Sequence, residues 1–137
     1  MGNNIIREDG MYGIKIVWPT WIDDTLADKR MGFPPGYDSK FDIPIKAKML
    51  VYVTDYKAIL AINEVTGTWE EGKKLYSPRG RFPLCLPIKE NFRAKNGLPL
   101  KEVQEVIRTF VPREGLSFFP LSQAEYMELE QVFLQRG

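Results

Sequence analysis

The chain has 137 residues, 44% of them apolar and 12% aromatic, which suffices for one domain with a buried core and is too little for two. It has no histidine and one cysteine, Cys85, so its composition excludes histidine-based catalytic triads, histidine-ligated metals and a disulfide within the chain. No stretch approaches the roughly 18 apolar residues of a membrane span, and no signal peptide is recognisable, so we expect a soluble, cytoplasmic protein.

The net charge of +1 hides a polarised distribution of charged residues. Between Lys73 and Arg113, ten Lys or Arg stand against three Glu, a surplus of +7, whereas the remaining residues carry nine Lys or Arg against fifteen acids. This basic segment also contains aromatic residues, and Trp69 lies just before it. Basic and flat side chains together favour a nucleic-acid strand or an exposed base as the partner.

The N-terminal part of the chain predicts a tail, a strand, a helix and a loop. Ile14, Ile16 and Trp18 alternate with other residues in the manner of a strand. Thr20 has the chemistry of an N-cap, and the density of Pro and Gly after the helix excludes further helix or a central strand there. In order, we expect a tail over 1–10, a strand over 11–18, a short helix from Thr20 to about Met31, and a stiff loop over 32–44, with residues 11–137 forming a single domain.

The central part predicts a β-hairpin and a further strand. Residues 47–54 and 57–69 are rich in β-branched and aromatic residues, which favours two paired strands. Apolar residues occupy both faces of the first of these strands, as is typical of a closed or half-closed barrel flanked by helices. Residues 82–89 predict another strand, in which Pro83 and Pro87 indicate an edge or a bulged position.

The C-terminal third predicts a helix, a strand and a second helix. Pro99 suits the first position of a helix that Pro112 ends, and residues 116–121 form a short apolar run. Ser122 and Glu125 have the spacing of a capping box, which begins a terminal helix. The whole order predicts an α+β domain whose strands are mostly antiparallel neighbours.

Several local strings in this order are those of a known family: the aromatic strand 12–18, Gly32-Phe33-Pro34, the hairpin 48–65, Ser77-Pro78-Arg79, and the helix start at 121–126. The chain resembles the EVE domain, a member of the PUA-like superfamily, which also contains the YTH readers of methylated adenine and the ASCH family. The resemblance runs from about residue 11 to about residue 134 and rests on order and spacing. It implies a PUA-like, mixed and mostly antiparallel β-barrel flanked by short helices.

The resemblance also implies a function. It indicates a non-enzymatic reader that takes a modified base of RNA or DNA into an aromatic pocket with a basic rim, without catalytic residues, cofactor or metal. Aromatic faces return roughly 1 to 3 kcal/mol per stacked base, so two or three rings form a useful pocket. We expect the pocket at Trp18, Trp21, Phe33, Tyr52 and Phe118, and the nucleic-acid backbone contacts at Lys73, Lys74, Arg79 and Arg81.

Each of these residues also has a structural interpretation. Trp18 and Trp21 are equally suited to packing on the end of the barrel, Tyr52 to a place in the core, and the basic residues to a solvated surface. Two other functions stay open: an enzyme on the same barrel that acts on a nucleotide-like substrate through an Asp/Lys or Tyr/Arg pair, and a module that binds a small ligand or a protein. The type of nucleic acid, the modification and the oligomeric state are also open.

Overall fold

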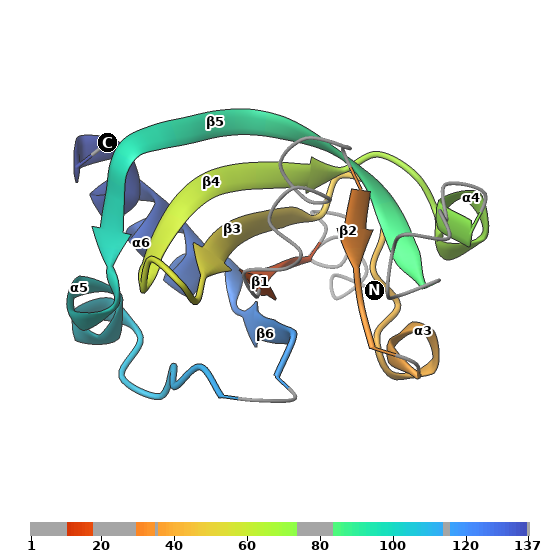
Figure 1. Cartoon of the computed structure of the whole chain (residues 1–137), viewed down its shortest axis with the longest axis horizontal. Helices are drawn as coiled ribbons and strands as arrows, with labels where there is room; N and C mark the ends of the chain where they lie inside the picture. Colours follow the sequence, from red (N-terminus) through yellow and green to blue (C-terminus); the bar gives the residue numbers. More distant parts are fainter. Residues whose placement is uncertain (1–10, 18–29, 35, 74–83, 114–115, 137) are drawn as a thin grey trace, which may run out of the picture.

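The computed structural model describes residues 11–17, 30–34, 36–73, 84–113 and 116–136. In these residues, six strands form one sheet that curls into a half-barrel, in the order β2-β5-β4-β3-β1-β6 (Figure 1). Neighbouring strands are antiparallel except β1 and β3, which are parallel. The elements are β1 (Tyr12–Val17), β2 (Arg30–Gly32), α3 (Tyr37–Lys40), β3 (Lys48–Val53), β4 (Ala58–Val65), α4 (Trp69–Lys73), β5 (Cys85–Pro99), α5 (Leu100–Val106), β6 (Phe118–Leu121) and α6 (Gln123–Arg136).

The curl of the sheet depends on β5, which is longer than the sequence predicts. The predicted strand over 82–89 continues to Pro99, and β5 pairs first with β2 and then with β4. Its register against β4 shifts twice, and such bulges bend a strand and increase its twist. Because Pro87 lies opposite Arg30 of β2, this proline does not mark an edge of the sheet, whereas Pro83 lies outside the described residues. β5 thus arches from the α4 end of the molecule to the α5 end (Figure 1).

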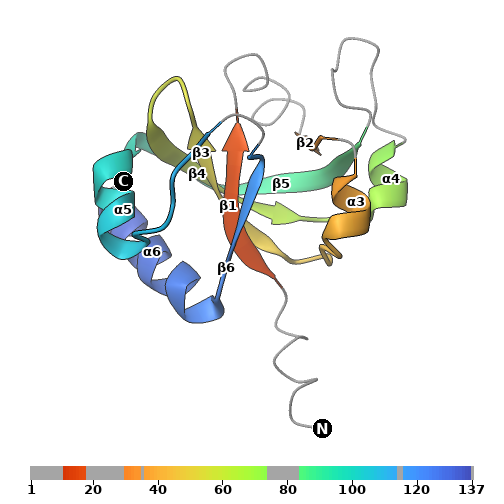
Figure 2. The ribbon, with the colours of Figure 1, turned by 90° about the horizontal axis from the view of Figure 1, so that it is seen from below.

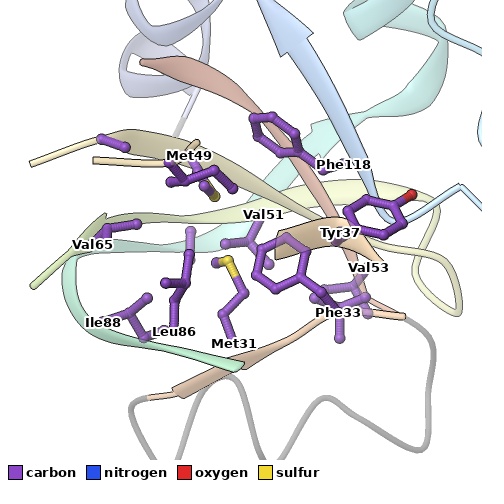
Figure 3. Packing of buried hydrophobic residues seen from close by; sticks show 14 of the residues in the cluster. Met31, Phe33, Tyr37, Met49, Val51, Val53, Val65, Leu86, Ile88 and Phe118 are labelled. Carbon is purple, nitrogen blue, oxygen red and sulfur yellow. The ribbon is translucent and has the colours of Figure 1, made fainter. Parts of the chain in front are cut away.

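Each face of the sheet has its own hydrophobic core, as the apolar residues on both faces of β3 predict. One core lies against α5 and α6 and is called the helix-side core; it includes Ile14, Leu50 and Tyr52. The other lies against β2, α3 and α4 and is called the barrel-side core; it includes Met49 and Val51. Figure 2 shows the two groups of elements on opposite sides of the sheet, and Figure 3 shows the packing of the barrel-side core.

The terminal helix begins at the predicted capping box. The backbone N–H of Ser122 donates to Oε1 of Glu125 over 2.9 Å, and the N–H of Glu125 donates to Oγ of Ser122 over 3.1 Å. This exchange satisfies two of the N–H groups that a helix start leaves unpaired. The helix then places Tyr126, Leu129 and Phe133 in the helix-side core.

Two predictions for the N-terminal half are wrong in the described residues. We predicted a helix from Thr20 to about Met31; residues 20–29 lie outside the described residues, and its predicted end is instead the strand β2, Arg30–Gly32. Pairing with β5 supplies hydrogen bonds that the local sequence does not reveal, so tertiary context overrides the local pattern. We predicted a loop over 32–44, but it contains the short helix α3. Gly36 precedes this helix with φ of 93°, a left-handed conformation that glycine adopts without strain.

Two element boundaries also differ from the prediction. The second hairpin strand ends at Val65 rather than at Trp69, because Thr68 and Glu71 form a capping box that starts α4. The helix after Pro99 ends at Val106, well before Pro112, because Ile107 has a non-helical conformation. Both differences shorten the regular elements and leave apolar residues in the connections between them.

Replacement of Ser122 by alanine is predicted to destabilise the fold by about 0.5 to 2 kcal/mol, because the N–H of Glu125 loses its acceptor. Urea denaturation measures the change. Ser39→Ala is the matched control, since Ser39 is exposed on α3 and is expected to change stability by less than about 0.5 kcal/mol. Equal effects of the two substitutions would contradict the role of the capping box.

Candidate functional site

Five aromatic residues gather on the barrel side of the sheet, at the gap between its two edge strands β2 and β6. Their ring centroids lie 5.1 to 5.7 Å apart in a continuous series, with edge-to-face contacts at both ends. Such geometries are favourable for aromatic pairs. We call these residues the aromatic cluster; in order of contact they are Trp69, Phe33, Tyr37, Phe41 and Phe118.

The backbone of three different elements holds the aromatic cluster in place. The N–H of Phe33, directly after β2, donates to the carbonyl oxygen of Leu84 over 2.9 Å. Phe118 begins β6, and its ring lies against Gly13 of β1, where an added Cβ would collide with the ring. Only a residue without a side chain therefore permits this ring to lie on the sheet. The cluster is thus set by the fold rather than by one flexible loop.

Tyr37 links the two edges of the half-barrel. Its hydroxyl oxygen accepts a hydrogen bond from the backbone N–H of Ser117 over 3.2 Å, which joins α3 to the segment that precedes β6. Its ring contacts Phe33 on one side and Phe41 on the other. Figure 3 shows Tyr37, Phe33 and Phe118 converging on the same region of the barrel-side core.

Lys15 lies in the middle of this aromatic environment. It is on β1, opposite Val51 of β3 and Phe118 of β6, and only 4% of its surface is exposed. Its Nζ lies 4.8 Å from the centroid of the Phe33 ring, a cation–π contact. The ammonium also donates to Oγ of Ser117 over 2.7 Å and to the carbonyl oxygen of Ile16 over 3.0 Å.

The positive charge of Lys15 has no negative partner in the described part of the chain. Burial disfavours the charged form of an amine, and it lowers the pKa of Lys15 from 10.5 to about 7. The lysine therefore changes charge close to neutral pH. A buried, unpaired ammonium lowers stability, and hydrogen bonds to neutral oxygens compensate only in part.

A second polar side chain lies on the same face of the sheet. Asn63 of β4 is 1% exposed, opposite Met49, and neither atom of its amide has a hydrogen-bond partner among the described residues. An unpaired buried polar group costs about 1 to 3 kcal/mol. The barrel side of the sheet thus contains polar groups that a core selected for stability alone would replace.

The aromatic cluster reaches the surface at Phe41 and Trp69. Both rings are half-buried, whereas Phe33 and Phe118 are almost completely buried. The indole N–H of Trp69 donates to the carbonyl oxygen of Phe41 over 3.3 Å. The exposed Lys40 extends along this opening, with its Nζ 5.7 to 5.8 Å from the ring centroids of Tyr37 and Phe41.

Charges of both signs surround this opening in the described residues. Asp38 and Asp42 lie near Lys40, and α4 begins with the acidic pair Glu70 and Glu71. The described basic residues of the segment 73–113 that follow α4 lie on β5, on α5 and in the connection after α5, so they do not form one patch with the aromatic cluster. They are Lys89, Arg93, Lys95, Lys101, Arg108 and Arg113.

The structure brings together two of the five expected pocket residues. Phe33 and Phe118 are members of the aromatic cluster. Tyr52 is not, because it lies on the opposite face of the sheet, where its ring packs against Phe110 at 5.4 Å. Lys73 ends α4. The other expected residues lie outside the described residues; they are Trp18, Trp21, Lys74, Arg79 and Arg81.

Sequence reasoning missed Lys15 and Ser117 altogether. One feature of the sequence could have revealed Lys15. It is a charged residue in the centre of an apolar strand, in a sheet with both faces covered, so its side chain has to be buried. Trp69 was assigned to a strand, so it was not placed near Phe33, and Phe41 was assigned to the same loop as Phe33 without a role in the pocket. No local pattern marks Ser117, which reaches Lys15 only because β6 pairs with β1.

The described residues contain no group of three or more His, Cys, Asp or Glu that could hold a metal ion. Among the same residues, no helix is both long and apolar enough to cross a membrane. Cys85 is buried as predicted, and its thiol lies 2.9 Å from the carbonyl oxygen of Gly72.

No family model and no curated protein matches the sequence. Solved structures match almost the whole chain. A hypothetical protein from Leishmania major has a TM-score of 0.67 at 19% identity and covers 94% of this chain and 98% of its own. An ASCH protein from Zymomonas mobilis has a TM-score of 0.61 at 13% identity, with coverages of 89% and 95%. The Pho92 YTH domain in complex with m6A has a TM-score of 0.64 at 5% identity, with coverages of 93% and 85%.

The chain shares its fold with ASCH and YTH domains. These are PUA-like folds, so the expected fold class is confirmed at that level. The two groups are the relatives that the sequence analysis associates with the EVE domain. Membership of the EVE family itself stays a prediction.

Replacement of Lys15 by methionine is predicted to change how stability depends on pH. Between the folded pKa of about 7 and the unfolded value of 10.5, the unfolded chain binds more protons, so wild-type stability rises with pH in this window. Methionine removes this pH dependence. Relative to the wild type, it raises the free energy of unfolding most below pH 7, where the buried charge is fully present. Urea denaturation at about pH 6, 7.5 and 9 measures both effects. If the free energy of unfolding depends on pH in the same way in the two proteins, the result would contradict a buried, unpaired ammonium at Lys15.

Proposed function

We propose that this chain is a nucleic-acid reader that takes one base, modified in its natural partner, into the aromatic cluster. The fold supports this, because one structure that shares it is a YTH domain in complex with m6A. The resemblance to EVE domains points to the same activity. RNA is the first candidate for the strand and DNA the second, and we place the protein in the cytoplasm.

The observation that carries the proposal is the aromatic cluster itself. A base that leaves its strand loses stacking worth a few kcal/mol, and each aromatic face returns roughly 1 to 3 kcal/mol. Trp69 and Phe41 are half-buried at the opening, so a base meets these rings first. It reaches Phe33 and Tyr37 when the outer rings turn aside. A buried methyl group adds about 0.8 kcal/mol, which favours a methylated base.

Lys40 and the basic residues that follow Trp69 in the sequence hold the phosphates in this proposal. Lys40 stands at the opening of the aromatic cluster. Lys73 ends α4 and Lys74, Arg79 and Arg81 follow it in the sequence, and α4 contributes Trp69, so we assign them the backbone contacts. Each phosphate contact makes binding weaker as salt increases. The acidic residues near Lys40 keep this electrostatic contribution moderate, so stacking supplies much of the affinity.

Replacement of Trp69 by leucine is predicted to weaken the binding of single-stranded oligonucleotides roughly 5- to 150-fold, which corresponds to the loss of one stacked base. Fluorescence anisotropy of labelled RNA and DNA, unmodified and methylated, at low and high salt measures the affinity. Lower affinity at high salt is expected for both proteins, because Trp69→Leu removes no charge.

Phe92→Leu is the matched control for this substitution. Phe92 is also a half-buried aromatic residue with an edge-to-face contact, to Phe133, but it belongs to the helix-side core. We expect its affinity to stay within about twofold of the wild type, since surface changes away from the site have small effects. Equal loss of affinity in the two variants would exclude the aromatic cluster as the binding site.

A second candidate function is an enzyme that acts on a nucleotide-like substrate, and the pair of Lys15 and Ser117 favours it. Nζ lies 2.7 Å from Oγ, and an amine with a pKa of about 7 can accept the hydroxyl proton at neutral pH. Incubation of purified protein with RNA, nucleosides and acylated nucleosides tests for turnover. Turnover that Ser117→Ala abolishes would establish this function. Binding without turnover would instead favour the nucleic-acid reader.

A further inference from the structure

We propose that Lys15 determines which base the aromatic cluster accepts, and that it selects a base whose inward edge presents a carbonyl oxygen over one that presents an amino group there. This inference rests on the proposed function, since it concerns the same site. It names a class of ligand, the bases with a keto group, that neither the fold nor the aromatic rings alone would specify.

The hydrogen bonds of Lys15 leave room for one more acceptor. A protonated lysine has three N–H donors. One points to the carbonyl oxygen of Ile16 and one to Oγ of Ser117. The third has no oxygen acceptor among the described residues, and the ring face of Phe33 is the remaining contact of the ammonium there. An oxygen atom that arrives beside Phe33 would complete the hydrogen bonding of this group.

The arrangement of the rings brings the edge of a base to that position. Phe33 has Lys15 near its face, and it makes an edge-to-face contact with Trp69, which reaches the surface. Within the described part of the chain, the aromatic cluster therefore separates Lys15 from the opening. A base that replaces the contact between Trp69 and Phe33 lies with one edge toward the interior, where the ammonium of Lys15 lies over the face of Phe33.

Electrostatics then distinguishes the two kinds of edge. A carbonyl oxygen accepts from the ammonium and supplies the third oxygen acceptor that the described residues do not provide. While Lys15 is protonated, below its pKa of about 7, an amino group at the same place would set donor against donor and leave both groups unsatisfied in a buried site. The lowered pKa of the lysine indicates how poorly its surroundings stabilise the charge, so an acceptor on the ligand has a large effect. N6-methyladenine, the base in the Pho92 structure, carries a donor on this edge, so the two proteins would differ in preference.

Two matched pairs of bases test this inference. Inosine differs from adenosine chiefly by a carbonyl in place of the amino group at position 6, and uridine differs from cytidine in the same way at position 4. Short single-stranded RNAs that vary only at one central nucleotide are titrated at about pH 6, where Lys15 is protonated, with the wild type and with two variants, Lys15→Met and Lys40→Met. Lys40 also lies over aromatic rings, but it is exposed at the opening, so it is the matched control.

The wild type is expected to bind inosine over adenosine, or uridine over cytidine, with a preference of roughly 10-fold or more, the usual size of discrimination by a buried charged donor. In Lys15→Met, that preference falls to within about twofold while salt-dependent binding persists. In Lys40→Met, all affinities decrease together and the preference stays. The ratio of affinities is the readout, because a purely structural effect of Lys15 would change every affinity alike.

Absence of a preference in the wild type, or a preference that survives in Lys15→Met, would overturn the role of Lys15 and leave the proposed function intact. Lack of salt-sensitive binding to every oligonucleotide would instead refute the proposed function and this inference with it. The Lys15→Met protein is expected to fold, because an unbranched apolar side chain replaces a buried charge of similar length.

Discussion

The burial of one unpaired ammonium among aromatic rings is the constraint on which the candidate site depends. Lys15 is held by two neutral oxygens and by the face of Phe33, without a carboxylate in the described residues. An apolar residue of the same shape would stabilise the sheet more. Asn63, on the same face of the sheet, adds a second polar group without a partner in the described part of the chain. Both residues place polar groups in a core that apolar side chains would stabilise more.

The two faces of the sheet are covered in different ways. In the helix-side core, the hydroxyl of Tyr126 donates a hydrogen bond to the carboxylate of Glu130, and its ring packs on Tyr12. The capping box at Ser122 fixes where α6 begins. Burial and the neighbouring carboxylate raise the pKa of Tyr126 well above its usual range, so this hydroxyl stays neutral. On the barrel-side core, β2 and α3 fold back over the sheet, and a hydrogen bond from Ser117 to Tyr37 closes the site. A rigid helix-side core thus supports a face that has less regular structure over it.

Much of the fold could be predicted from the sequence, and less of the site. Alternation in β1 and β3 and the capping box at Ser122 depend on neighbouring residues, so they are readable locally. Their order predicted an α+β domain, and the resemblance to the EVE domain implied the PUA-like class. Phe33 was selected because loop aromatic residues often bind ligands, and it is in the cluster. Tyr52 is also aromatic but has the opposite strand parity, which places it in the other core. The pairing of Lys15 with Ser117 spans 102 residues and follows from the β1–β6 register, which no local pattern specifies.

The measurement that tests the central claim most directly is the map of NMR chemical-shift changes that single-stranded RNA causes in the labelled protein. The account predicts the largest changes in the side chains of Trp69, Phe41, Phe33 and Tyr37 and in the Nζ of Lys15, with small changes in α6 and at Tyr52. Changes concentrated on α5 and α6, or spread along β5 without the aromatic cluster, would contradict it and assign binding to the charged outer surface.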